Sequence, residues 1–154
     1  MRDHNWLVDQ LNYLLNAYFG DVKISNPIEI KFGREAKYRF GSIKLYKPRG
    51  TKGLRGLGRL IGSVAKPTKS IITITSMFAS ESVPVHVVRY TICHELCHYA
   101  HGFSSANKRL FKHPHHGGIV NKELTTRGAQ NLIFEFKKWL KEYRKKILLH
   151  RTTI

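Results

Sequence analysis

The sequence contains few cysteines and no long apolar run, and each shortage excludes a class of protein. Cys93 and Cys97 are the only cysteines, and they lie four residues apart in one expected helix. A disulfide scaffold is therefore not expected, and we predict two buried thiols. No apolar stretch approaches the roughly 18 residues of a membrane span, and the N-terminus lacks the apolar core of a signal peptide. We expect a cytoplasmic protein that has no membrane partner.

Acidic residues are also scarce. Against 27 lysines and arginines stand 10 aspartates and glutamates, which gives 154 residues a formal net charge of +17. Twelve of the basic residues lie between positions 31 and 69 and seven between 137 and 151, with one acid in each segment. This excess is larger than solubility requires and indicates a polyanionic partner, such as a nucleic acid.

The segment 48–63 is rich in glycine and basic residues, which predicts a flexible loop able to contact a phosphate backbone. It lacks the Gly-Lys-Ser/Thr spacing of a nucleotide-binding loop, so ATP is excluded as its ligand. Nucleic-acid contacts are expected from this loop and from the last helix, at Arg49, Lys52, Arg55, Arg59, Lys141 and Lys145.

Length and hydrophobic patterning predict a single domain spanning residues 1–154 in the α+β class. Apolar residues at helical spacing indicate a helix at the N-terminus, one around 82–102 and a long one at 128–150. Ser82 is the expected N-cap of the second, with Pro84 in its first turn. Period-two patterns predict a small antiparallel sheet, with strands at 28–32, at 37–46 with a bulge or turn at 41–42, and at 69–78.

The stretch TICHELCHYAHG, residues 91–102, contains the motif HExxH. His94 and His98 are four residues apart on a helix, so both imidazoles can reach one ion at about 2.0 to 2.1 Å. Glu95 lies beside the first histidine, where it can exchange a proton with water activated by the metal. The motif predicts one Zn²⁺ per chain, held by His94 and His98, with Glu95 as the catalytic acid and base.

A hydrolytic zinc site needs a third protein ligand, and several residues compete for this place. His101 lies on the same helical face but about 10 Å along the axis from His94, which is too far. The metzincin pattern is excluded because it would place glycine at position 101 and histidine at 104. The remaining candidates lie downstream: His113, His115, His116 and Glu123.

A strand, a helix ending in HELCHY and a later loop with a His-Gly pair resemble the SprT-like metallopeptidase family. The resemblance covers about residues 30–125 and implies a zincin-like fold. It also implies that His94, His98 and His116, which precedes Gly117, hold zinc, and that Glu95 is the catalytic residue. Family members often place a large aromatic residue where this chain has Val120, and many append a zinc ribbon that this chain lacks.

The resemblance further implies a zinc endopeptidase that cleaves proteins bound or crosslinked to DNA, as in the repair of DNA–protein crosslinks. The DNA would be single-stranded or partly unpaired, and the protein would be associated with the nucleoid or, in a eukaryote, with the nucleus. We expect the strand that begins at Lys69 to pair by its edge with an extended substrate. The alternatives are a peptidase with one dedicated regulatory substrate, and a nucleic-acid-binding module with structural zinc. A zinc nuclease is disfavoured, since the sequence shows no acidic cluster for a second metal.

Overall fold

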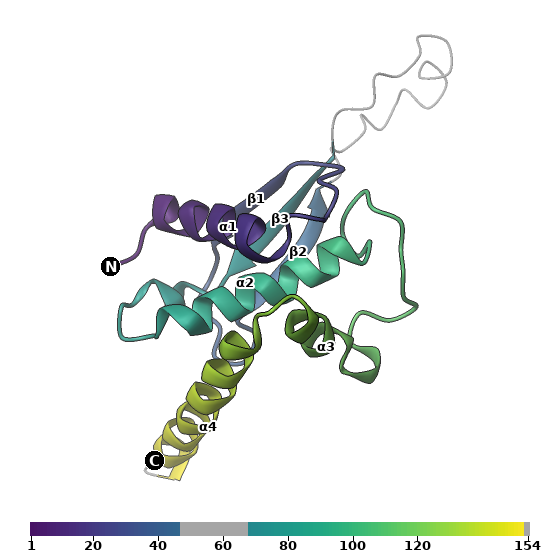
Figure 1. Ribbon diagram of the computed structural model, residues 1–154. Coiled ribbons are helices and arrows are strands. Elements are labelled where there is room, and N and C mark those ends of the chain that lie inside the picture. Colours follow the sequence, from purple (N-terminus) through teal and green to yellow (C-terminus); the bar gives the residue numbers. More distant parts are fainter. Residues whose placement is uncertain (47–67, 153–154) are drawn as a thin grey trace, which may run out of the picture.

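The computed structural model describes residues 1–46 and 68–152 and has the predicted α+β composition (Figure 1). The described part contains four α-helices and one three-stranded sheet. The α-helices and strands, in chain order, are α1 (His4–Tyr18), β1 (Ile28–Phe32), β2 (Gly41–Tyr46), β3 (Lys69–Ile74), α2 (Val85–Ala100), α3 (Ile119–Thr126) and α4 (Gln130–Thr152). Two short 3-10 helices, η2 (Ser76–Ala79) and η3 (His116–Gly118), follow β3 and precede α3.

The sheet is mixed, so the expectation of an antiparallel sheet was wrong. Its strand order is β1-β3-β2, with β1 parallel and β2 antiparallel to β3. Residues 33–40 form no strand, and Thr75 ties them to the end of β3. Its hydroxyl accepts from the Ala36 amide at 2.9 Å, and its amide donates to the Phe40 carbonyl at 2.9 Å. This segment keeps β1 and β2 apart, so that β3 lies between them.

One face of the sheet carries the hydrophobic core. Ser70, Ile72 and Ile74 of β3 are fully buried, as the period-two pattern of a half-buried strand requires. α1 and α2 cover this face (Figure 1). Within α1, Leu7 and Leu14 are fully buried, and Asp3 caps the helix by accepting a hydrogen bond from the Trp6 amide.

α2 begins at a different cap from the one expected. Pro84 is the N-cap residue and makes no side-chain capping bond, so the assignment of Ser82 as N-cap was wrong. The Ser82 hydroxyl instead lies 2.7 Å from the Ser80 hydroxyl. At its other end, α2 is closed by the His101 amide, which donates to the Cys97 carbonyl, and by Gly102 in the left-handed conformation with φ of 80°.

The two cysteines are buried free thiols on α2, as predicted. Burial raises the pKa of the Cys93 thiol to about 12, and it also raises the pKa of Cys97. Both thiols therefore remain protonated at neutral pH and act as small apolar groups in the core.

The C-terminal part of the chain contains α3, which the sequence patterns did not predict, and the expected long helix α4. The first half of α4 packs on the domain through an aromatic cluster in which Trp139 contacts Phe40 and Phe78. The second half extends away from the body of the domain (Figure 1). None of the helices in the described ranges is long and apolar enough to cross a membrane.

Gly102 and Gly128 form a matched pair for testing how the end of α2 is built. Both have positive φ, 80° and 83°, but a Cβ on Gly102 would lie 2.5 Å from the Lys108 carbonyl, whereas a Cβ on Gly128 would meet nothing within 4 Å. We expect Gly128→Ala to lower the free energy of unfolding by about 1 kcal/mol through strain alone. Gly102→Ala adds a backbone collision and should cost about 2–4 kcal/mol. Equal losses in urea unfolding would contradict the close packing of Gly102.

Candidate metal centre

α2 places two histidines on the face opposite to its buried stripe. Ile92 and Leu96 point into the core and are 0% and 1% exposed. His94 and His98 lie one turn apart, and their rings are 4.8 Å apart between centroids. Since the apolar stripe fixes the rotation of the helix about its axis, it also fixes the side of α2 from which the two imidazoles project.

A third histidine, His115, meets this pair from the loop that follows α2. Its Nε2 atom lies 3.1 Å from Nε2 of His94 and 3.0 Å from Nε2 of His98. The ligand atoms of the three residues all lie within 4.8 Å of one another. Nitrogens bound tetrahedrally to zinc at 2.0 to 2.1 Å are about 3.3 Å apart, so the two pairs that His115 forms are close to the spacing that a zinc ion requires.

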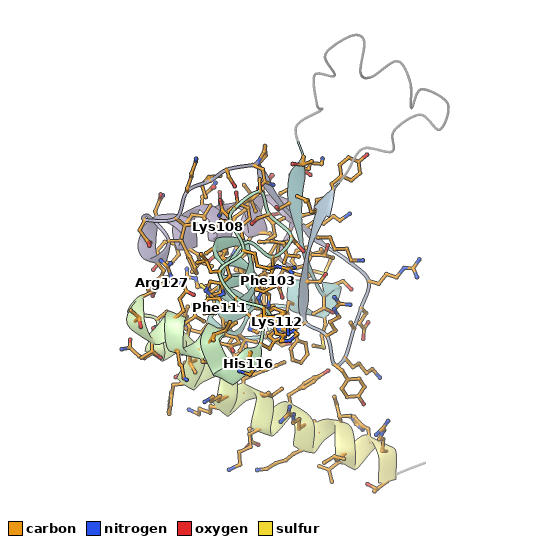
Figure 2. The ribbon with its side chains drawn as sticks, turned by 90° about the vertical axis from the view of Figure 1, so that its right-hand side faces the viewer. Phe103, Lys108, Phe111, Lys112, His116 and Arg127 are labelled. Carbon is orange, nitrogen blue, oxygen red and sulfur yellow. The ribbon has the colours of Figure 1, made fainter. Side chains whose placement is uncertain are left out.

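Hydrogen bonds fold the loop back along α2 so that it can deliver His115. Near its start, the Ser104 carbonyl accepts from the Ser70 hydroxyl of β3 at 2.6 Å. The Ala106 amide then donates to the Asn26 side chain at 2.9 Å. Further on, the Leu110 amide donates to the His101 carbonyl at 2.9 Å. Figure 2 looks onto this loop, on which Phe103, Lys108, Phe111 and Lys112 are labelled.

The third position of the cluster is therefore occupied by His115 and not by His116, the residue implied by the family resemblance. His116 begins η3, and the two left-handed glycines that follow it turn the chain into α3. Its ring lies 6.5 Å from that of His113, and neither belongs to the cluster. The physical reason is that the loop presents His115 to α2 one residue before the chain turns.

Glu123, another candidate, is engaged elsewhere. One of its oxygens pairs with Nε2 of His101 and the other accepts from Arg127 at 2.8 Å. Arg127 also pairs with Asp21, which joins α3 to the segment after α1. His101 and Glu123 thus form a partly buried ion pair that links α2 to α3, and neither belongs to the cluster of three histidines.

His94 and His98 are held in the neutral form that binds metals. Burial, assisted by the neighbouring His115, lowers the pKa of His94 from 6.5 to about 4. Burial, assisted by His94 and His115, lowers the pKa of His98 to about 3. At neutral pH, both rings therefore have a free lone pair for a cation.

Glu95 lies next to the cluster and is 6% exposed. Burial raises the pKa of its carboxyl from 4.5 to about 7, and the positive charge of Arg39 opposes this rise. Gly41 of β2 allows this packing, because a Cβ there would lie 3.1 Å from Oε1 of Glu95 and 2.7 Å from Cγ2 of Thr91. A carboxyl group with a pKa near 7 can both accept and donate a proton under physiological conditions.

Two adjoining hollows meet at His94 and Glu95, and we call them together the Glu95 cleft. Their volumes are about 260 and 390 Å³, and both are lined by Arg39 and Gly41. The second also contains His98, His115 and Arg109.

Sequence reasoning missed Arg39 and Arg109 as residues of the site and assigned Gly41 only to a bulge or turn. The one sequence signal for the close packing against Glu95 was the glycine at the start of an alternating strand.

The expected nucleic-acid contacts are divided between described and undescribed parts of the chain. Arg49, Lys52, Arg55 and Arg59 lie outside the described residues. Lys141 and Lys145 are exposed on α4, and Lys145 pairs with Glu142 at 3.0 Å.

Comparisons of the chain with protein-family models, curated proteins and solved structures found no match.

The neighbouring histidines His115 and His116 allow a direct test of the third ligand. We expect His115→Ala to weaken zinc binding by more than the roughly 100-fold that loss of an outer-shell partner costs, since a ligand itself is removed. His116→Ala should leave the affinity unchanged. Zinc titration against a fluorescent chelator would measure both, and loss of binding in the His116 variant alone would refute the assignment.

The pKa of Glu95 predicts how stability depends on pH in metal-free protein. Because the folded-state pKa, about 7, exceeds the unfolded value, 4.5, the wild type loses stability as the pH rises between these values. Glu95→Gln does not titrate, so it should be more stable than the wild type at pH 8 by up to about 3 kcal/mol. His94 and His98 are common to both proteins, so their contributions cancel in the difference. Urea unfolding from pH 5 to 8.5 measures it, and a difference independent of pH would contradict the raised pKa.

Proposed function

We propose that the protein is a zinc-dependent endopeptidase with a zincin-like active site of the SprT-like type. The observation that carries this proposal is the convergence of His94, His98 and His115 beside Glu95 at the floor of a cleft. Three imidazoles leave one tetrahedral position for water or substrate, which is the arrangement of catalytic and not of structural zinc sites.

The division of labour follows from the positions of the side chains. His94, His98 and His115 would hold the ion, which when bound polarises the scissile carbonyl and lowers the pKa of water. Glu95 takes a proton from the attacking water and returns it to the leaving amine, a double role that suits a pKa of about 7. Arg39 lines the same cleft and supplies a positive charge close to Glu95.

The strand to which we assign substrate binding differs from the one expected. β3, which begins at Lys69, is bonded to β1 and β2 on its two sides, so it has no free edge, and that expectation was wrong. Among the described residues, β2 forms one edge of the sheet, and its residues Gly41, Ser42 and Ile43 line the Glu95 cleft. An extended polypeptide can add to this edge through backbone hydrogen bonds, which favours weak sequence selectivity.

Proteins bound or crosslinked to DNA are the substrates we propose. The net charge of +17 favours a polyanionic partner, and the DNA would be single-stranded or partly unpaired. Lys141 and Lys145 lie one turn apart on α4 and are exposed, as phosphate contacts must be. A protease with little selectivity for side chains needs such a second signal, because DNA then brings enzyme and substrate together.

A peptidase with one dedicated substrate is the first alternative, and a nucleic-acid-binding module with structural zinc is the second. The position of Glu95 favours an enzyme over the module. A structural site has no use for a buried carboxyl group in a cleft beside the metal ligands, where burial of the charge is costly.

The test is cleavage of a DNA-binding protein by the zinc-loaded full chain, with and without single-stranded DNA. Glu95→Gln is the blank. We expect cleavage only with DNA, and at least a roughly 100-fold loss of rate in the variant, because a general acid and base contributes about that much or more. One equivalent of bound zinc without cleavage in either condition would refute the proposal.

The DNA part of the proposal needs variants of its own. Lys141→Ala/Lys145→Ala should weaken stimulation by DNA. The control variant Lys23→Ala/Lys122→Ala removes the same charge at exposed sites outside both basic segments. It should retain stimulation by DNA. Equal effects of the two pairs would indicate a response to net charge and not a binding surface on α4.

A further inference from the structure

A third hollow lies between α4 and residues 37–40, and we call it the α4 groove. Its volume is about 430 Å³. Its apolar lining comes from both segments and includes Tyr38, Phe40, Phe136, Leu140, Tyr143, Ile147 and Leu148. Tyr38 is 69% exposed and Leu148 is 61% exposed, although apolar groups of this size are normally buried.

The rim of the α4 groove is basic. Lys37, Arg144 and Arg151 border it, and none of the described residues that line it is acidic. A ligand that complements the groove therefore has apolar side chains next to negative charges. A second copy of this chain does not fit this description, because two molecules with a net charge of +17 repel each other.

The aromatic residues of the groove are mostly occupied by one another. Tyr143 is stacked on Trp139 with centroids 4.7 Å apart and an interplanar angle of 14°, and its hydroxyl donates to the Lys37 carbonyl at 3.0 Å. Phe40 contacts both rings edge to face. Binding of single strands depends on open aromatic faces, and here only Tyr38 is largely exposed. The aliphatic lining from α4 favours polypeptide side chains over bases.

The α4 groove is continuous with the Glu95 cleft. Tyr38, Phe40 and Phe136 line both the groove and the smaller of the two hollows that form the Glu95 cleft. A polypeptide that enters the cleft can therefore continue along α4 without leaving the surface. At 100° per residue, Lys141 and Lys145 lie about 100° to 160° around α4 from Leu140 and Ile147, on the side that carries Leu148, so DNA bound there would border the groove at Leu148 and leave the rest of it open.

We propose that the α4 groove is an exosite for the polypeptide substrate, which binds a segment of apolar residues flanked by aspartate or glutamate. This proposal rests on the proposed peptidase function. It makes selection of substrate depend on a segment remote from the scissile bond, because the edge of β2 contributes mainly backbone contacts.

The experiment uses full-chain Glu95→Gln, which cannot consume its ligand, and a fluorescein-labelled amphipathic peptide with a leucine stripe flanked by glutamates. Leu148→Glu should weaken binding about tenfold or more, as loss of a central apolar contact does. Phe134→Glu is the matched control, because Phe134 is 65% exposed on the same helix and does not line the groove. Fluorescence anisotropy measures the affinities, and circular dichroism checks that both variants fold.

The outcomes separate this proposal from the proposed function. Peptide affinity that Leu148→Glu leaves unchanged, or that both variants reduce equally, would overturn the exosite. Tenfold weaker binding of oligothymidylate in Leu148→Glu alone, without peptide binding, would also overturn it by assigning the groove to nucleic acid. Peptide binding that depends on Leu148, in a zinc-loaded wild type that cleaves nothing, would support the groove and refute the peptidase.

In an active enzyme, KM and kcat should distinguish substrate contacts in the α4 groove from those in the Glu95 cleft. Leu148→Glu in the wild-type background should raise KM for a protein substrate about tenfold. It should leave kcat and KM unchanged for a short fluorogenic peptide that occupies only the Glu95 cleft. Equal losses on both substrates would overturn the exosite.

Discussion

Burial of one face of α2 against the sheet is the interaction on which the candidate site depends. Ile92 and Leu96 are enclosed in the core, so the helix cannot rotate without exposing them. The opposite face must then present His94 and His98 to the cleft, with Glu95 on the flank beside them. The start of β2 lies close to α2, and Gly41 is the residue that makes room for the Glu95 carboxyl. The packing of the core and the geometry of the candidate site are therefore both set by α2.

The position of the third histidine depends on interactions remote from HExxH in the sequence. Asn26 precedes β1 and Ser70 belongs to β3, yet both hydrogen-bond to the loop that delivers His115. The Asn26 side chain also donates to the Ser70 hydroxyl at 2.9 Å, and its backbone contacts the Tyr99 hydroxyl. The sheet therefore supports the loop through a small buried polar network, in addition to supporting α2 through apolar contacts.

The features predictable from the sequence were those set by local periodicity. Spacing on a helix placed His94 and His98 together, and alternation identified β1 and β3, although the strand expected at 69–78 ends at Ile74. The choice of His115 over His116 could not be made, because a shift of one residue in a loop is decided by distant partners such as Ser70 and Asn26. The order of the strands could not be predicted for the same reason, since nothing local to β3 indicates that it has a neighbouring strand on each side.

The loop between His98 and His115 gives the proposed metal a second effect. These ligands are about 17 residues apart in the sequence, so an ion held by both would act as a cross-link that closes a loop. A covalent link across about 15 residues restricts the unfolded chain by about 3 kcal/mol in the loop-entropy model, and a tightly held ion acts in the same direction. The loop could then detach from α2 only by giving up a ligand, so the ion that activates water would also hold its own site closed.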